Sequence, residues 1–152
     1  MKDLKGEARA VIALCQFDLT RCFGYPYTKD NGASLGAPLI DHLVGTYENP
    51  SRSTVAQAYD FIIETLEEAV TLMSEEKNNG RMNKYAARAL LARVYLYHND
   101  NRKAFDMAEQ LIKDVDASGS YALYPHEKYV AAWSVETKFG SESFFEIANS
   151  VD

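Results

Sequence analysis

The sequence predicts an all-α protein of antiparallel helical hairpins, with one long connecting loop and a short strand near its end. Two observations support this prediction. Residues 87–92 repeat residues 8–13, with small, charged and large side chains in the same order. Each copy lies in a segment with helical spacing of its apolar residues, and a second amphipathic segment follows each. Repeated helix pairs are typical of stacked scaffolds, whose units bury their apolar faces against one another.

The composition is that of an ordinary single domain. The chain has 152 residues, 47% hydrophobic and 25% charged, a length that buries roughly two-thirds of the unfolded chain's surface. The net charge is −6 and no basic stripe is evident, so nucleic acid is not an expected partner. No apolar run reaches the roughly 18 residues of a membrane span. The start, MKDLKGEARA, has no signal-peptide pattern, which leaves a cytoplasmic protein or an internal piece of a longer chain as alternatives.

The first helix is expected over residues 1–24. Gly24 ends it, and the following Tyr25-Pro26 forces an extended exit. The two cysteines of this helix lie two turns apart, about 10.5 Å along the axis, which is too far for a disulfide. We therefore expect buried structural thiols. The residues predicted to face the core by their i, i+3, i+4 spacing are Val11, Leu14, Cys15, Leu19, Cys22 and Phe23.

Residues 25–52 are expected to form a long loop. Asp30-Asn31-Gly32 is a turn signal, and Gly36 and Pro38 interrupt any regular element. A connection of this length in a compact domain is often functional. Simple wrapping around the helices is an equally good explanation, and the sequence leaves both open.

Three further helices are expected. The second covers residues 53–76 and begins with a capping box at Thr54. The third covers residues 82–98, with Asn83 as a good N-cap, and the fourth covers residues 101–117. The residues predicted to face inward on the fourth helix are Ala104, Phe105, Ala108, Leu111, Ile112 and Val115.

The third and fourth helices partly match the tetratricopeptide repeat. Leu91, Ala92 and Tyr95 stand where that repeat places its Leu, small residue and Tyr, and Ala104 falls at the small position of the next helix. The later Ala and the closing Pro of the repeat are absent. We therefore expect a tetratricopeptide-like scaffold in which a leucine at Ala89 or Ala92 overpacks a helix crossing and costs roughly 1–3 kcal/mol.

The last segment, residues 121–152, is expected to be mainly irregular. Residues 121–125 read as extended, and residues 129–133 are compatible with one helical turn. Residues 143–147, with the sequence SFFEI, fit a short β-strand. Such a strand needs a partner, and no second good strand is evident.

The sequence offers no catalytic, metal-binding or phosphate-binding constellation. His42, His98 and His126 are far apart, and none has a second ligand at a usable spacing. A Gly-rich phosphate loop and a nucleophile elbow are both missing. We therefore expect no enzymatic activity, no cofactor and no metal.

Four charged residues near apolar or small side chains are expected to be structural. Asp18 lies beside the apolar face of the first helix, and Arg21, three residues on, is placed to pair with it. Arg88 and Arg93 stand among the small residues of the third helix. Ion pairs that join helices are the favoured interpretation of all four, and ligand contact is the alternative.

Two aromatic pairs are the candidate ligand contacts: Tyr129 with Trp133, and Tyr25 with Tyr27. An aromatic face stacks well on a sugar ring, and the tyrosine hydroxyl adds a hydrogen bond. Most aromatic side chains nevertheless pack in cores or between helices. Packing is therefore the alternative interpretation of both pairs.

Several motifs, in the same order, resemble the SusD/RagB family of outer-membrane nutrient-binding proteins. The resemblance spans nearly the whole chain. The matching segments are Glu7-Ala8-Arg9-Ala10, Phe17-Asp18-Leu19-x-Arg21-x-Phe23-Gly24, Pro26-Tyr27-Thr28, Gly36-Ala37-Pro38-Leu39, Tyr59-x-x-Ile62-x-x-x-Leu66-x-x-Ala69, the third helix from Ala86 to Leu96, and Ser143-Phe144-Phe145-Glu146-Ile147.

The resemblance implies a tetratricopeptide-like scaffold decorated by irregular segments. Family members are lipoproteins of the outer membrane and cell surface, which cap a TonB-dependent transporter and hand over glycans or other nutrients without catalysis. Members are several times longer than this chain. The resemblance therefore implies a single helical domain, residues 1–152, that is part of a larger protein and exposes apolar surface prone to self-association.

Sugar contacts in the family come mostly from loops outside the matched motifs, so the resemblance assigns no ligand residue. The alternative function is a small tetratricopeptide-like adaptor that holds a peptide or a partner helix in a groove. An ordered segment over residues 25–52, packed across the helices, would favour the nutrient-binding function. A bare groove lined by polar and aromatic residues would favour the adaptor.

Overall fold

The chain folds into two antiparallel helical hairpins. The computed structural model describes residues 1–133 and 139–147. In the first hairpin α1 (Lys2–Phe23) packs along α2 (Val55–Leu72), and in the second α3 (Lys84–Tyr97) packs along α4 (Asn101–Ser118). The hairpins meet mainly through α2 and α3. The helical-hairpin fold expected from the sequence is confirmed.

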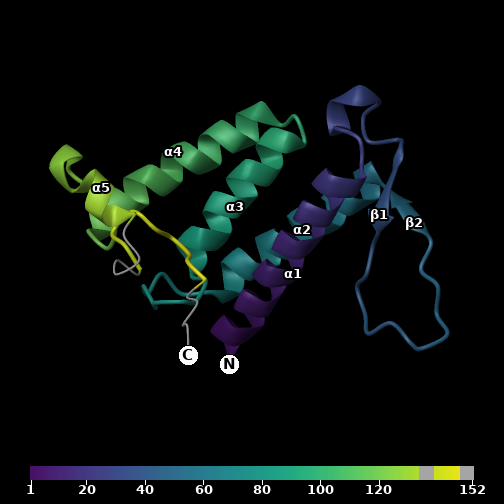
Figure 1. Ribbon diagram of the computed structural model, residues 1–152, viewed down its shortest axis with the longest axis horizontal. Helices are drawn as coiled ribbons and strands as arrows, with labels where there is room; N and C mark the ends of the chain where they lie inside the picture. The colour runs from purple at the N-terminus through teal and green to yellow at the C-terminus, as the bar shows by residue number, and fades with distance from the viewer. Residues whose placement is uncertain (134–138, 148–152) are drawn as a thin grey trace.

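Short elements lie at the two ends of the helical layer. A 3₁₀ turn, η1 (Tyr27–Lys29), and two antiparallel strands, β1 (Leu35–Pro38) and β2 (Arg52–Thr54), follow the first helix. A second 3₁₀ turn, η2 (His126–Lys128), leads into α5 (Tyr129–Ala132) at the opposite end of the molecule (Figure 1).

Two expectations about strands and loops were wrong. Residues 143–147 form no strand in the described structure. The strands β1 and β2, at residues 35–38 and 52–54, pair with each other far from this segment. Residues 25–52 are not simply a loop, since they include η1 and the β1 strand. The SFFEI segment is held instead by aromatic packing, which an alternating pattern does not reveal.

Side-chain caps fix the starts of three helices. Thr54 Oγ1 accepts a hydrogen bond from Gln57 N at 3.1 Å, and Gln57 Oε1 accepts one from Thr54 N at 3.0 Å, which completes the expected capping box of α2. Asn83 Oδ1 caps α3 by accepting from Ala86 N at 3.1 Å. Asp100 caps α4 in the same way.

Small side chains allow α1 to lie close to α2. Gly6, Ala10 and Ala13 are buried in this interface. A Cβ at Gly6 would collide with Met73 Cγ and stand 3.2 Å from the carbonyl oxygen of Ala69. Phe17 completes the contact, with its ring edge-on to Tyr59 at a centroid distance of 6.2 Å. The narrow face of α1 is therefore the one that α2 covers.

The predicted buried face of α1 was wrong. Val11, Leu19 and Phe23 are exposed by 39%, 43% and 65%, Cys15 and Cys22 are exposed free thiols, and Leu14 is half-buried. The helix has two apolar faces, and periodicity identified the one with larger side chains. The small-residue face packs on α2 because it allows the closer backbone approach.

The inward face predicted for α4 was partly wrong. Ala104, Leu111 and Val115 are buried and face α3, and Ala108 is half-buried. Phe105 and Ile112 are 59% and 61% exposed. A helix packed on a single neighbour covers only a narrow stripe, so these two residues fall outside it.

The segment over residues 25–52 is anchored to both hairpins. Tyr27 packs edge-on against Tyr59 at 5.6 Å and lies 4.2 Å from the His98 ring, centroid to centroid. Arg52 Nε donates to the Gly36 carbonyl oxygen at 2.7 Å, and its Nη2 donates to Leu35 at 3.0 Å. Burial raises the pKa of Tyr59 to about 12. The segment is thus ordered and packed against the helices.

A histidine clamp closes the exposed loop between β1 and β2. His42 Nδ1 lies 2.6 Å from Asp41 Oδ1, and His42 Nε2 lies 2.7 Å from Glu48 Oε1. Glu48 Oε2 also accepts a hydrogen bond from Gly45 N at 3.1 Å. The hydrogen bond to Asp41 first, and that to Glu48 second, raise the pKa of His42 above its ordinary value of 6.5.

We predict that Ala87→Leu destabilises the fold and that Ala92→Leu does so less. Ala87 is fully buried in the core and Ala92 is half-buried, so the added side chain at Ala87 overpacks by about 1–3 kcal/mol. Urea unfolding of both variants measures the difference. Equal midpoints for Ala87→Leu and wild type would contradict the prediction.

We predict that the loop clamp weakens with rising pH. Because the pKa of His42 is raised in the folded state, its contribution is fully present below pH 6.5 and is lost as pH rises through the folded-state pKa. An NMR titration of the His42 ring measures that pKa. Glu48→Gln keeps an acceptor for Gly45 but removes one charge, so it should lower the pKa of His42. An unchanged titration in this variant would show that the clamp does not form.

Candidate functional site

An open aromatic cavity lies beside α5. Its volume is about 370 Å³, within the usual range of small-molecule sites. Tyr129 and Trp133 are one helical turn apart, which places both side chains on the same side of this short helix. Their ring centroids are 6.2 Å apart with planes at 70°, and Trp133 is 77% exposed. Tyr124 forms a third aromatic wall.

The polar groups of the cavity come from residues 140–146. Glu142 accepts a hydrogen bond from Tyr124 N, and the Tyr124 hydroxyl oxygen accepts one from Ser141 N at 3.2 Å. A Cβ at Gly140 would collide with that hydroxyl group, so glycine allows the tyrosine its position. Glu146 Oε2 is buried and has no hydrogen-bond partner among the described residues. The cavity thus combines aromatic faces with a carboxylate, one oxygen of which is buried and has no hydrogen-bond partner in the described structure.

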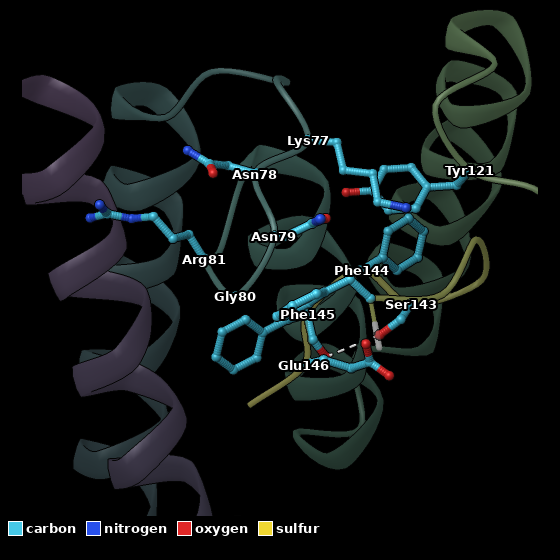
Figure 2. A pocket seen from close by; sticks show the side chains of 11 residues that line it. Lys77, Asn78, Asn79, Gly80, Arg81, Tyr121, Ser143, Phe144, Phe145 and Glu146 are labelled. Carbon is cyan, nitrogen blue, oxygen red and sulfur yellow. Dashed lines mark hydrogen bonds between the residues drawn. The ribbon is translucent and has the colours of Figure 1, made fainter. Parts of the chain in front are cut away.

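An adjoining pocket, shown in Figure 2, is a structural junction. It is lined by the loop from Lys77 to Arg81, by Tyr121 and by residues 143–146. Its volume is about 10 Å³, which is space for a single water and not for a sugar. Ser143 and Glu146 line both this pocket and the aromatic cavity. The junction therefore supports the cavity without being able to hold a ligand.

Tyr121 is the centre of the junction. Lys77 Nζ lies 4.5 Å from the centroid of its ring, and Phe144 packs edge-on at 4.8 Å (Figure 2). Asn83 Nδ2 donates to the Tyr121 hydroxyl at 2.9 Å, and Lys77 Nζ donates to the Gly140 carbonyl at 3.2 Å. Burial raises the pKa of the Tyr121 hydroxyl. The N-terminus of α3 is thereby tied to the segment that forms the cavity.

The second aromatic pair predicted from the sequence is not brought to this cavity. Tyr25 and Tyr27 lie near η1, at the end of the molecule opposite α5 (Figure 1). Tyr27 packs between α2 and α3, and the exposed ring of Tyr25 is covered by the Lys29 ammonium group at 3.1 Å from its centroid. The two rings make separate contacts with protein groups, and they form no common platform.

The structure places Asp18 and Arg21 in an ion pair on one helix. Arg21 Nη2 lies 3.0 Å from Asp18 Oδ1, and Nη1 donates to the Tyr97 hydroxyl at 3.4 Å. The guanidinium also lies over the rings of Phe17 and Tyr97, at 4.9 and 5.3 Å from their centroids. Arg21 therefore joins α1 to α3, whereas the ion pair that Asp18 makes lies within its own helix.

Arg88 and Arg93 have different surroundings. Arg88 is 8% exposed, and its Nη1 lies 2.7 Å from Asp114 Oδ2, an ion pair that joins α3 to α4. Hydrogen bonds from Arg88 and then from Gln110 lower the pKa of Asp114. Arg93 is exposed and makes no hydrogen bond or ion pair within the described part of the chain. Ala89, like Ala92, is half-buried.

Sequence reasoning missed Tyr124, Glu142 and Glu146 as parts of the cavity. Glu146 belongs to the SFFEI motif, but that motif does not indicate a cavity, and no motif marks Tyr124 or Glu142. The three residues meet only where residues 121–124 pass residues 140–146. The main-chain bond from Ala122 N to the Ser141 carbonyl, 3.0 Å long, holds these two segments together.

Fold and site define a helical scaffold with an aromatic cavity at one end. No group of three or more His, Cys, Asp or Glu side chains among residues 1–133 and 139–147 is arranged to hold a metal ion. Within the same residues, no helix has both the length and the apolar character needed to cross a membrane.

Residues 1–96 match the SusD-like family described as starch-binding and associating with the outer membrane. The chain belongs to this carbohydrate-binding family. No curated protein matches the chain.

Solved structures of this superfamily share the fold. A SusD superfamily protein from Bacteroides vulgatus ATCC 8482 is 91% identical with a TM-score of 0.95, over 99% of this chain and 34% of its own. One from Bacteroides thetaiotaomicron VPI-5482 is 42% identical with a TM-score of 0.88, over 96% and 31%. A laminarin-binding SusD-like protein, 24% identical with a TM-score of 0.67 over 92% and 29%, is alike in fold. The chain spans about a third of the length of these proteins.

We predict that Asn83→Ala destabilises the chain more than Tyr121→Phe. The first change removes the N-cap of α3, worth about 0.5–2 kcal/mol, together with the bond to Tyr121. The second removes only that bond, worth about 0.5–1.5 kcal/mol, and keeps the ring contacts. Thermal unfolding of both variants compares them. A Tyr121→Phe effect as large as that of Asn83→Ala would show that the cap contributes nothing.

Proposed function

We propose that this chain is the helical scaffold of a larger, non-catalytic glycan-binding protein of the outer membrane. The observation that supports this most strongly is the family match over residues 1–96. The lengths of the solved relatives support the second part of the proposal, since residues 1–152 correspond to only about a third of each.

The aromatic cavity beside α5 is the proposed carbohydrate contact of this portion. Trp133 and Tyr129 are exposed and face the same cavity, so the apolar face of a sugar ring can stack on them. Glu146 lines the same cavity, and its carboxylate would accept a bond from a sugar hydroxyl. The cavity volume of about 370 Å³ suits one or two sugar rings.

The order of residues 25–52 supports this function over the peptide-binding adaptor. Tyr27 and Arg52 anchor the segment to α1, α2 and α3. The segment therefore adds an ordered surface to the helical layer. A simple adaptor has no need of such an elaboration. Docking to a TonB-dependent transporter, as a cap that delivers the glycan, is proposed as the role of the complete protein.

The test of the proposal is a calorimetric titration with laminarin and with starch. The chain is compared with a chimera in which residues 1–152 replace the corresponding third of the 91% identical relative. Saturable binding of either glycan by the chimera supports the proposal. Failure of both glycans and of a wider glycan array, together with binding of a peptide, would support the adaptor.

We predict that Trp133→Ala weakens glycan binding by about tenfold, or ~1.4 kcal/mol, because it removes the most exposed stacking face of the cavity. Trp133 is the only tryptophan of the chain, so its fluorescence also reports occupancy. Tyr47→Ala is the matched control, since Tyr47 is a 95% exposed aromatic residue outside the cavity. Equal losses in both variants would exclude the cavity as the contact.

A further inference from the structure

The outward face of α1 is a continuous apolar surface. Successive helical residues are turned by about 100°, so these side chains fall within an arc of about 120°. An arc of this width is typical of a helix face that packs against a protein core. The members of this α1 face are Leu4, Val11, Ile12, Cys15, Leu19, Cys22 and Phe23, all of them exposed.

The α1 face is separate from the face that packs within the hairpin. Ala10, Ala13 and Phe17 point toward α2 and are almost completely buried. Two basic residues at one margin of the face, Lys5 and Arg9, are paired with Glu68 of α2, at 2.8 and 3.1 Å. No charged group interrupts the apolar face itself, and leaving it in water would be costly.

A groove extends the α1 face at its C-terminal end. One wall is formed by Leu19 and Phe23. The other wall is formed by Ala37 and Pro38 of β1 together with Ile40, which lies just beyond the strand. The groove has a volume of about 600 Å³, enough for large apolar side chains. Arg52 and Gln16 fix the second wall by hydrogen bonds to the carbonyl groups of Gly36 and Pro38, at 2.7 and 3.3 Å. Face and groove together form a surface along the whole of α1.

The relatives indicate what covers this surface. The 91% identical protein has this chain as 34% of its length, so roughly two-thirds of a closely similar polypeptide lies outside residues 1–152. The structure from Bacteroides thetaiotaomicron gives a similar proportion, with 31% covered. A membrane surface fits less well, because the flanking charges include both signs and the chain carries a net charge of −6.

We propose that the α1 face binds an amphipathic helix from the part of the polypeptide outside residues 1–152. This helix packs its apolar side chains along Leu4 to Phe23 and inserts one of them into the groove beside Pro38. The proposal concerns the assembly of the protein and is independent of glycan binding at the α5 cavity.

The two free cysteines provide the test, because both lie on the α1 face. Maleimide labelling of Cys15 and Cys22 is measured in the isolated chain and in the monomeric chimera, whose other cysteines are replaced by serine. We expect labelling to be about 100-fold slower in the chimera, because a buried thiol reacts only after local opening. Equal rates in the two proteins would overturn the proposal. So would protection that occurs only when the chimera dimerises, since a second copy would then be the occupant.

A charge placed in the face gives an independent measurement. Leu19→Lys is expected to lower the Tm of the chimera and leave that of the isolated chain nearly unchanged, because the side chain is buried only in the longer protein. Asp60→Lys, on the exposed side of α2, is the matched control and should affect neither. An unchanged Tm of the Leu19→Lys chimera would contradict the proposal, even if maleimide reacts slowly with Cys15 and Cys22 in that variant.

Discussion

The close approach of α1 to α2 is the constraint on which the rest of the structure depends. Gly6, Ala10 and Ala13 have too little side chain to hold the two helices apart. Once this narrow face is used for the hairpin, the larger apolar side chains of α1 must point the other way. The exposed α1 face is thus a direct result of helix packing geometry, and so is the groove that continues it beside β1.

The repeat seen in the sequence has a counterpart in the ion pairs between helices. Arg9 pairs with Glu68 on α2, and Arg88, at the matching position of the second copy, pairs with Asp114 on α4. An exposed pair such as Arg9 with Glu68 contributes little to stability, on the order of 0–1 kcal/mol. Burial of residues such as Phe17, Ile62 and Leu91 is the larger contribution. The arginines therefore help to orient the helices of each hairpin, while the apolar core stabilises them.

Architecture and proposed recognition occupy different parts of the molecule. The helical layer is stabilised by its own core, whereas the cavity is built from the short α5 and two irregular segments that are joined through Tyr121. Loops held on a rigid scaffold can vary in sequence without loss of the fold. Under the proposed function, a residue of the cavity such as Trp133 could therefore change while α1 to α4 stay the same.

The sequence by itself determined the helices, their caps and the family. The capping box at Thr54 and the cap at Asn83 are local interactions between residues three apart, so they can be read directly from the order of residues. Tertiary structure decided which apolar face of α1 is buried, because two faces competed and only the size of the facing side chains selects between them. Tertiary structure also gave the rings of Tyr25 and Tyr27 different surroundings, and it placed the ring of Tyr124 against Gly140. Such contacts join residues distant in sequence, and no local pattern records them.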